Sequence, residues 1–229
     1  MSLALLLMLV TFALSLWASL KVKSAYHRWA NIPASSGLTG AEAAQRILSA
    51  AGIRDVEIVG VDGELVDHYD PQHKRLVLSR DNFYGTSVAA LSVAAHECGH
   101  ALQHQQRYAP LEARMAAVGA TTIASQIVMW LPIIGMATGI LATYTGVLIM
   151  AIGWGIIMLF NLITLPVEFD ASRRAKAILT RTGMVLAGRE ALGVHQVLNA
   201  AALTYVAAFL TSLAYFLWYL LPLLTGRRG

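Results

Sequence analysis

Charged residues are scarce in this chain. Asp, Glu, Lys and Arg make up 13% of its 229 residues, whereas they make up about a quarter of an ordinary soluble protein. None of them occurs from Met115 to Val167, a run of 53 residues. Because about 20 apolar residues cross a bilayer and one helix of this length would reach about 80 Å, the run predicts two membrane spans. We expect the turn between them at Gly135 to Gly139, after Pro132.

Two further stretches lack charge. One covers Val197 to Leu224 and allows a last span, and the other is the N-terminal SLALLLMLVTFALSLWASL at residues 2–20. No basic residue precedes this N-terminal stretch, and the WASLKVK at its end is a poor match to a small-x-small cleavage site. We therefore favour a signal anchor over a cleaved signal peptide, and both interpretations leave the chain bound to the membrane.

Cysteine is nearly absent as well. The single Cys98 excludes an intrachain disulfide, which agrees with a reducing compartment.

The net charge of +4 is too small to indicate a nucleic-acid partner, so we expect none. The oligomeric state stays open.

Two groups of basic residues follow the first and third predicted spans. They are Lys21, Lys23 and Arg28, and Arg173, Arg174, Lys176 and Arg181. By the positive-inside rule, residues 21–115 and 168–195 lie in the cytoplasm, and we expect a multi-pass protein of the cell inner (plasma) membrane. Arg227 and Arg228 disagree with this topology, because a fourth span would carry them to the outer side.

Residues 21–115 form the one extended region of ordinary polar composition. Thr39-Gly-Ala-Glu42 is a capping-box pattern, which opens a helix that ends near Gly52. Asp62-Gly63 is a hairpin signal. The other elements predicted here are strands at 56–61, 64–69 and 74–79 and a helix at about 87–105.

The last of these helices carries His96-Glu97-Cys98-Gly99-His100, the pattern H-E-x-x-H. Positions i and i+4 share one helix face about 6 Å apart along the axis, so both imidazoles can reach one zinc ion. Glu97 lies about 100° round the helix from His96, close to the place of a zinc-bound water. It could take a proton from that water as general base and pass it to a leaving amine. Cys98 is turned away from the zinc, and we expect it to pack.

The alternative to a metal site is a buried helix with incidental polar groups. Such a helix would hold two histidines and a glutamate among Val, Ala and Leu residues, and buried ionisable groups are costly without partners. A metal is the simplest partner, and a chance occurrence of the pattern has a probability of about one per cent or less. We therefore favour a metal site.

A catalytic zinc usually has three protein ligands and one open position, so a third ligand must come from outside this helix. Glu168, in LPVEFDASRRA, is the first charged residue after the long uncharged run, and we expect it to open a helical stretch. Asp170 is the alternative ligand. Either acid could instead lie at a helix N-terminus and interact with the partial positive charge of the helix dipole there. We favour Glu168 as the ligand.

Five segments resemble a known family, in order along the chain. They are DHYDP (67–71), LVLS (76–79), AAHECGHALQ (94–103), LPVEFDAS (165–172) and AAALTY (200–205). The family is that of the YugP-type neutral zinc metallopeptidases, which are similar in motif to HtpX and the CAAX prenyl proteases. The resemblance implies a gluzincin site with one zinc ion per chain. In such a site His96, His100 and Glu168 bind the zinc, and Glu97 is the base.

One position departs from the wider gluzincin pattern. An acid normally follows the glutamate ligand by four residues and supports a ligating histidine, but this residue is Ser172 here. The support must then come from elsewhere, and Ser172 itself and Asp170 are the candidates.

Five other polar residues are weaker candidates. His68 and Tyr69 lie on a predicted strand before the helix and could be near the cleft. His195, Asn199 and Tyr205 precede or enter the last span, where polar groups in apolar surroundings point to function. One of these three could hold the oxyanion, although for each residue a structural role is the more common one.

Together these patterns predict an α-helical integral membrane protein of about four transmembrane helices with a small α+β, gluzincin-like metallopeptidase domain. The expected layout is a first transmembrane helix at 2–20, the metallopeptidase region at 21–115, transmembrane helices 2 and 3 at 116–166, a helix with the third ligand at 167–196, and transmembrane helix 4 at 197–224.

We expect a zinc endopeptidase that works at the membrane boundary, with the bilayer as a partner and membrane-associated or misfolded polypeptides as substrates. Arg75–Ser79, as an edge strand, could hold an extended substrate by strand addition. One alternative is a site-2-type intramembrane protease, since Phe83 to Cys98 has only Glu97 charged, but the chain lacks the L-D-G that supplies the third ligand there. The other is a non-catalytic zinc-binding or transport protein.

Overall fold

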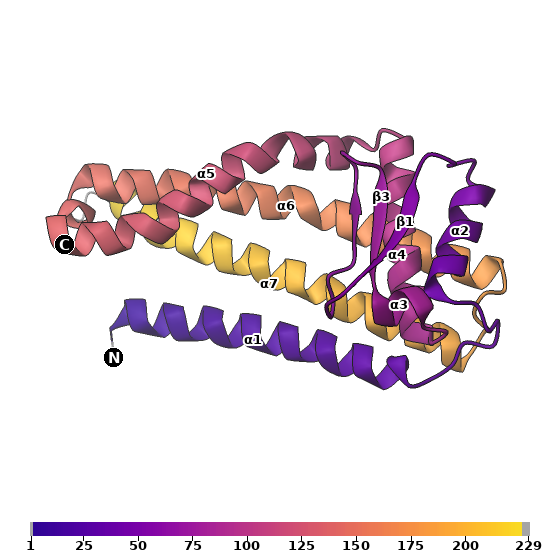
Figure 1. The fold of residues 1–229 in the computed structure, drawn as a ribbon. Helices are drawn as coiled ribbons and strands as arrows, with labels where there is room; N and C mark the ends of the chain where they lie inside the picture. Colours follow the sequence, from indigo (N-terminus) through magenta and orange to yellow (C-terminus); the bar gives the residue numbers. More distant parts are fainter. Residues whose placement is uncertain (1, 226–229) are drawn as a thin grey trace. The chain divides into compact units, whose positions relative to one another are not determined.

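The computed structural model describes residues 2–225 (Figure 1). Its helices are α1 (Leu3–Ala30), α2 (Gly40–Ala50), α3 (Arg80–Tyr84), α4 (Val88–Gln105), α5 (Ala109–Thr138), α6 (Tyr144–Arg181) and α7 (Arg189–Thr225), with one 3-10 helix, η1 (Ile140–Ala142). Its strands are β1 (Glu57–Val61), β2 (His68–Asp70) and β3 (Arg75–Ser79). These elements form two compact units.

Unit 1 comprises residues 2–16, 112–165 and 205–225 of the described chain and is almost entirely apolar. Four helices that contribute to it, α1, α5, α6 and α7, are each long and apolar enough to cross a membrane. Inside the unit, the ring of Trp154 stacks on that of Tyr215 with centroids 4.5 Å apart. The membrane fold with four long apolar helices is thus confirmed. Arg227 and Arg228, which disagreed with the predicted topology, lie outside the described residues.

The turn predicted at Gly135 to Gly139 comes later than expected. α5 stays helical through Thr138, with Pro132 inside it. The break is at Gly139, whose φ of 71° lies in the left-handed region. Glycine adopts this conformation without a steric penalty, so the last glycine of the predicted turn is the one that ends the helix.

Unit 2 comprises Trp17–Leu111 and Pro166–Thr204, and it contains a three-stranded sheet in the order β1-β3-β2. β1 runs parallel to β3, and β2 runs antiparallel to it. Four of the five β3 residues are buried. A strand so deeply buried is stable at the centre of a sheet, because backbone groups on both of its edges then find partners.

Two sequence predictions about this sheet are wrong. The hairpin predicted around Asp62-Gly63 does not form, because β1 pairs with β3 and not with β2. Arg75–Ser79 is the central strand and not an edge strand, so its backbone is not open to an added strand. Both errors concern pairing between strands, which depends on burial across the whole sheet and not on a local turn signal alone.

The local helix signals of unit 2 are confirmed. Thr39 and Glu42 form the predicted capping box at the start of α2. This helix ends just before Gly52, which has a φ of 74°. Ser87 caps α4 by accepting a hydrogen bond from the N–H of Ala90 at 3.1 Å, and α4 then runs unbroken to Gln105.

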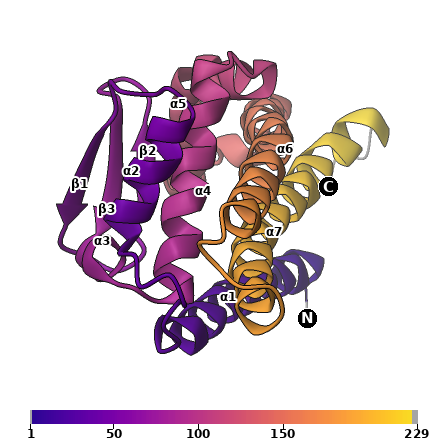
Figure 2. The same ribbon diagram turned by 90° about the vertical axis from the view of Figure 1, so that its right-hand side faces the viewer.

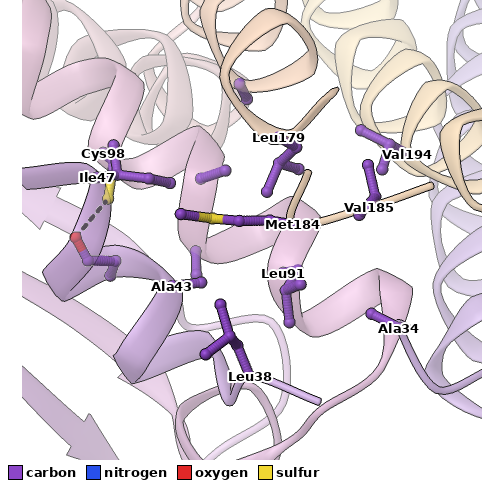
Figure 3. Close-up of a cluster of buried hydrophobic side chains, with 14 of the residues drawn as sticks. Ala34, Leu38, Ala43, Ile47, Leu91, Cys98, Leu179, Met184, Val185 and Val194 are labelled. Carbon is purple, nitrogen blue, oxygen red and sulfur yellow. Dashed lines mark hydrogen bonds between the residues drawn. The ribbon is translucent and has the colours of Figure 1, made fainter. Parts of the chain in front are cut away.

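α4 lies in the middle of unit 2. Figure 2 shows α2 and the sheet on one side of it and α6 on the other. Side chains of these helices and of the loop after α6 meet in an apolar core that includes Ile47, Leu91 and Leu179 from the helices and Met184 from the loop (Figure 3). Cys98 is fully buried in this core, with its Sγ 3.7 Å from the carbonyl oxygen of Ala44, which confirms its expected packing role.

α6 differs from expectation at Glu168 and Asp170. The sequence pattern places these acids at the start of a helix, but α6 begins at Tyr144 and continues past both of them to Arg181. Neither acid lies in the first turn of α6, so neither interacts with the partial positive charge at the N-terminus of this helix. Within α6 the boundary of the two units falls just before Pro166, and both acids belong to unit 2.

Candidate metal centre

α4 presents His96 and His100 on one face, one helical turn apart. Their ring centroids are 4.8 Å apart. His100 is buried and His96 is half-buried, and most of the surrounding helix is buried as well. The two imidazoles therefore occupy a largely enclosed place rather than the protein surface.

α6 approaches α4 closely at Gly99, between the two histidines. A Cβ atom added to Gly99 would lie 2.8 Å from the carbonyl oxygen of Ala171 and 3.0 Å from its Cα. Non-bonded carbon atoms pack at about 3.5–4.0 Å, so only glycine lets the two backbones come this close. The approach brings Glu168 and Ser172, which flank Ala171 on α6, within reach of the histidine rings.

Three potential ligand atoms converge here. His96 Nε2 lies 3.2 Å from Glu168 Oε2, and His100 Nε2 lies 3.6 Å from the same oxygen. The three ligand atoms all lie within 4.8 Å of one another. Two donors bound to one tetrahedral zinc at about 2.0–2.1 Å are about 3.4 Å apart, so the distances from the Glu168 oxygen to the two nitrogens fit a zinc ion. Two imidazoles and a carboxylate also suit zinc chemically.

Negative charge gathers at the same point. Glu168 is 1% exposed and Glu97 is 7% exposed. Burial alone would lower the pKa of His100, but the hydrogen bond to Glu168 and the charge of Glu97 outweigh it and raise this pKa above its ordinary value. The site therefore favours a cation, and a metal ion can take the place of the proton on the histidine.

Gln103 determines which nitrogen of His100 carries the proton. Its Nε2 donates to the carbonyl oxygen of Val167 at 2.8 Å and to Asp170 Oδ2 at 3.0 Å. Because both of those partners only accept, the amide oxygen of Gln103 is the atom that lies 3.0 Å from His100 Nδ1. His100 Nδ1 must then be the donor, and the lone pair of Nε2 is left for a metal.

His96 is supported by Ser172. The hydroxyl oxygen of Ser172 lies 3.2 Å from His96 Nδ1, so it can accept the Nδ1 proton and leave Nε2 facing Glu168. Ser172 stands four residues after Glu168, where the wider gluzincin pattern has an acid. Of the two residues expected to support a histidine, Ser172 therefore contacts His96 directly, whereas Asp170 reaches His100 only through Gln103.

Asp170 lies behind the ligand group. It accepts a hydrogen bond from Gln103 and forms ion pairs with Arg173 and Arg174. Among the described residues, the possible metal ligands that come together are His96, His100 and Glu168. Of the two acids that the sequence offers as third ligand, Glu168 therefore lies next to the histidines. Asp170 instead accepts a hydrogen bond from the Gln103 amide.

Glu97 is a buried acid beside this group. Its charge contributes to the raised pKa of His100, which places it close to the ligands. Within the described part of the chain it forms no hydrogen bond or ion pair. An unpaired buried carboxylate is costly, and its oxygens are available to a water molecule or a substrate.

His68 and Tyr69 on β2 lie outside the ligand group. His68 is exposed, with its Nδ1 2.8 Å from the carbonyl oxygen of Val66. The Tyr69 hydroxyl is hydrogen-bonded to His104 Nδ1 at 2.9 Å, which ties β2 to the end of α4. Tyr69 therefore has a structural contact one turn beyond His100.

The remaining candidates are on α7. His195 is exposed, and Asn199 Oδ1 accepts a hydrogen bond from Lys176 Nζ at 2.6 Å. Neither hydrogen-bonds to one of the three ligand residues within the described chain. Tyr205 belongs to unit 1, and its role in holding the oxyanion stays a prediction.

Gln103 is the site residue that sequence analysis missed. A signal was available, because a glutamine three residues after His100 falls on the buried part of an apolar helix, and a buried amide needs hydrogen-bond partners. Its partners Val167 and Asp170 are more than 60 residues away along the chain. The sequence alone therefore could not show what Gln103 binds.

Two comparisons relate this chain to known proteins. A family model described as "Putative neutral zinc metallopeptidase" matches residues 4–224. A curated relative from Bacillus subtilis (strain 168), "Putative membrane protease YugP", is 45% identical over 226 residues, which is 96% of either chain. No solved structure matched the chain.

Proposed function

Since the chain belongs to the neutral zinc metallopeptidase family, we propose that it is a membrane-bound zinc endopeptidase in which Glu97 activates the attacking water. The observation that carries the proposal is the convergence of His96, His100 and Glu168, from two helices, beside a buried acid that has no hydrogen-bond or ion-pair partner among the described residues. Structural zinc sites are usually closed by four protein ligands. Three ligands with a free carboxylate nearby favour a catalytic site.

The metal would be held by His96 Nε2, His100 Nε2 and a carboxylate oxygen of Glu168. When bound, zinc would supply a Lewis acid that polarises the scissile carbonyl and makes a water molecule more acidic. Gln103 and Ser172 act on the other side of the rings, where each occupies a histidine Nδ1. They keep both imidazoles in the orientation and protonation state that a metal requires.

Glu97 moves the proton of the reaction. Its carboxylate takes a proton from the attacking water as the water oxygen bonds to the carbonyl carbon, and then gives that proton to the amine nitrogen as the C–N bond breaks. The lack of competing hydrogen bonds on Glu97 among the described residues supports this role. A general base of this kind contributes about 10²–10⁴-fold to the rate.

The substrates we propose are membrane-associated or misfolded polypeptides. Glu168 follows Leu165, the last residue of α6 in unit 1, by three residues, and α5 begins at Ala109, soon after the histidines. The ligands are thus adjacent in sequence to helices that can cross a membrane. The charge distribution further supports a site that faces the cytoplasm from the plasma membrane.

An extended substrate could add to the free edge of β2. β3 is central, so the edges of the sheet are β1 and β2. Of the two, β2 is tied to α4 by the hydrogen bond between Tyr69 and His104. Backbone pairing with this edge would hold a polypeptide in extended form without requiring a particular side chain.

The intramembrane alternative has less support. Among the described residues, four helices are long and apolar enough to cross a membrane, and α4 is not one of them. The histidines therefore lie on a helix of unit 2 that is not one of these four candidate spans. The other alternative, a non-catalytic zinc-binding or transport protein, is distinguished from a peptidase by measuring both zinc binding and cleavage.

The test is cleavage of unfolded casein by the protein purified in detergent. We expect cleavage by the wild type, its loss after treatment with a chelator, and its return when zinc is added. Glu168→Gln should bind less zinc and not cleave, whereas Glu57→Gln, at an exposed acid of the sheet, is the matched control and should cleave normally. Cleavage that survives complete zinc removal would refute the proposal, and zinc binding without any cleavage would favour a zinc-binding or transport role.

A further inference from the structure

A groove separate from the metal centre lies between α1 and α7 within unit 2. Its walls include Lys21, Ala25 and Arg28 from α1 and Gln196, Asn199 and Ala200 from α7. The groove has a volume of about 320 Å³, which is enough for a phosphate group and its substituents. None of the residues that line it takes part in the metal centre.

The packing of the two helices explains why the groove exists. At one end α1 and α7 are in close contact, since a Cβ atom added to Gly193 would lie 2.5 Å from the ring of Trp29. Further along, small side chains at Ala25 and Ala200 face the space between the helices and leave it unfilled. Figure 1 shows the parts of the two helices that belong to unit 2, residues 17–30 and 189–204, next to each other.

The two amides in the groove present only hydrogen-bond donors. Trp29 Nε1 donates to Gln196 Oε1 at 3.0 Å, and Lys176 Nζ donates to Asn199 Oδ1 at 2.6 Å. An indole N–H and an ammonium can only donate, so in both amides the oxygen is the atom already engaged. The NH₂ groups of Gln196 and Asn199 are the atoms left to face a ligand.

Lys21 and Arg28 add two positive charges to these donors. Both side chains are exposed, and neither forms a hydrogen bond or ion pair with another described residue. No Asp or Glu lines the groove. A surface that combines two cations and two NH₂ groups, without a carboxylate, complements an anion with several acceptor oxygens.

One end of the groove lies towards the uncharged segments of α1 and α7. α1 has no charged residue before Lys21, and in the described part of α7 none follows Glu190. Leu203 lines the groove at this end. Basic pockets between transmembrane helices bind the headgroups of anionic lipids. We propose that the groove binds the phosphate of an anionic membrane phospholipid, whose acyl chains enter the bilayer that α1 and α7 are long and apolar enough to cross.

The test measures lipid binding by the full chain in detergent, with fluorescent phosphatidylglycerol as the probe and phosphatidylcholine as the comparison lipid. We expect the wild type to prefer phosphatidylglycerol, and Lys21→Gln with Arg28→Gln to weaken that binding about thirty-fold, which corresponds to two surface cations. Lys23→Gln with Arg46→Gln removes the same charge outside the groove. That pair should bind phosphatidylglycerol as the wild type does.

A second variant tests the role of the amide NH₂ groups in the groove independently of Lys21 and Arg28. Asn199→Asp keeps an acceptor for Lys176 but replaces the NH₂ group by a charged oxygen, so it should weaken phosphatidylglycerol binding. Gln45→Glu, at an exposed residue of α2, makes the same charge change elsewhere and should not. Equal losses in the paired variants, or no preference for phosphatidylglycerol in the wild type, would overturn the proposal. Displacement of the lipid by millimolar glycerol 3-phosphate would also overturn it, in favour of a soluble phosphate ligand.

Discussion

At the scale of single residues, the metal centre depends on where protons lie as much as on which atoms face the metal. His100 can bind a metal through Nε2 only if its proton is on Nδ1, and the hydrogen bonds of Gln103 require that arrangement. The H-E-x-x-H pattern predicts the two histidine ligands of the proposed site, because their spacing is local. It does not identify Gln103 as a support, because the partners that orient the amide lie on another helix.

Gln103→Leu should lower the affinity for zinc. The leucine has a similar volume but cannot accept the Nδ1 proton of His100, and loss of such a supporting contact typically costs about 10–100-fold in metal affinity. The measurement is a zinc titration against a chelating dye. Gln105→Leu is the control, because Gln105 is exposed and makes one long hydrogen bond of 3.4 Å. Unchanged zinc affinity in a folded Gln103→Leu protein would show that His100 needs no such support.

Cys98 should be unreactive in the folded protein. Burial, with a further contribution from the charge of Glu97, raises the pKa of its thiol well above the ordinary value. A raised pKa keeps the thiol protonated at a pH where a free cysteine has begun to ionise, and the thiolate is the reactive form. Alkylation by iodoacetamide at pH 8 to 9 should therefore be slow when the protein is folded and fast in denaturant. Similar rates in both states would contradict the buried position.

At the scale of elements, the sequence predicted helices well and strand pairing poorly. The starts of α2 and α4 follow from capping residues within one turn of each helix. The order of the sheet does not, because β1 and β3 pair across a gap that contains β2. Likewise, the continuity of α6 past Glu168 could not be read from a change in composition alone.

Gly99→Ala tests the contact between α4 and α6. The added methyl group would collide with the backbone of Ala171, and such overpacking costs about 1–3 kcal/mol. Because relief of the collision moves Glu168 away from the histidines, the variant should lose zinc as well as thermal stability. Gly119→Ala, where an added Cβ meets nothing within 4 Å, is the helix control and should keep both. A Gly99→Ala protein with normal zinc content would show that the close approach is not required.

At the scale of the whole molecule, the distribution of charged and apolar residues was the most informative feature of the sequence. The 53-residue uncharged run and the two apolar ends predicted four membrane helices, and four helices of the described chain meet that description. The division into two units could not be predicted, because α1, α6 and α7 each contribute to both of them. A polar segment and an apolar segment of one helix look like separate elements in the sequence.

The sidedness predicted from the basic residues can be tested with single cysteines, since Cys98 is buried. Ala142→Cys lies in the connection between α5 and α6, and Gln72→Cys lies in the turn between β2 and β3. A membrane-impermeant maleimide should label Ala142→Cys in intact cells, and Gln72→Cys only after the cells are permeabilised. The reverse labelling would place the metal centre on the outer side.

The most direct test of the account compares the wild type with Glu97→Gln for zinc content and for cleavage of unfolded casein. Glutamine keeps the size of the side chain but cannot take a proton from water, and the three ligand residues are untouched. We predict a zinc content equal to that of the wild type and a loss of cleavage of about 10²–10⁴-fold. A zinc-loaded Glu97→Gln protein that cleaves at the wild-type rate would contradict the assignment of Glu97 as the base.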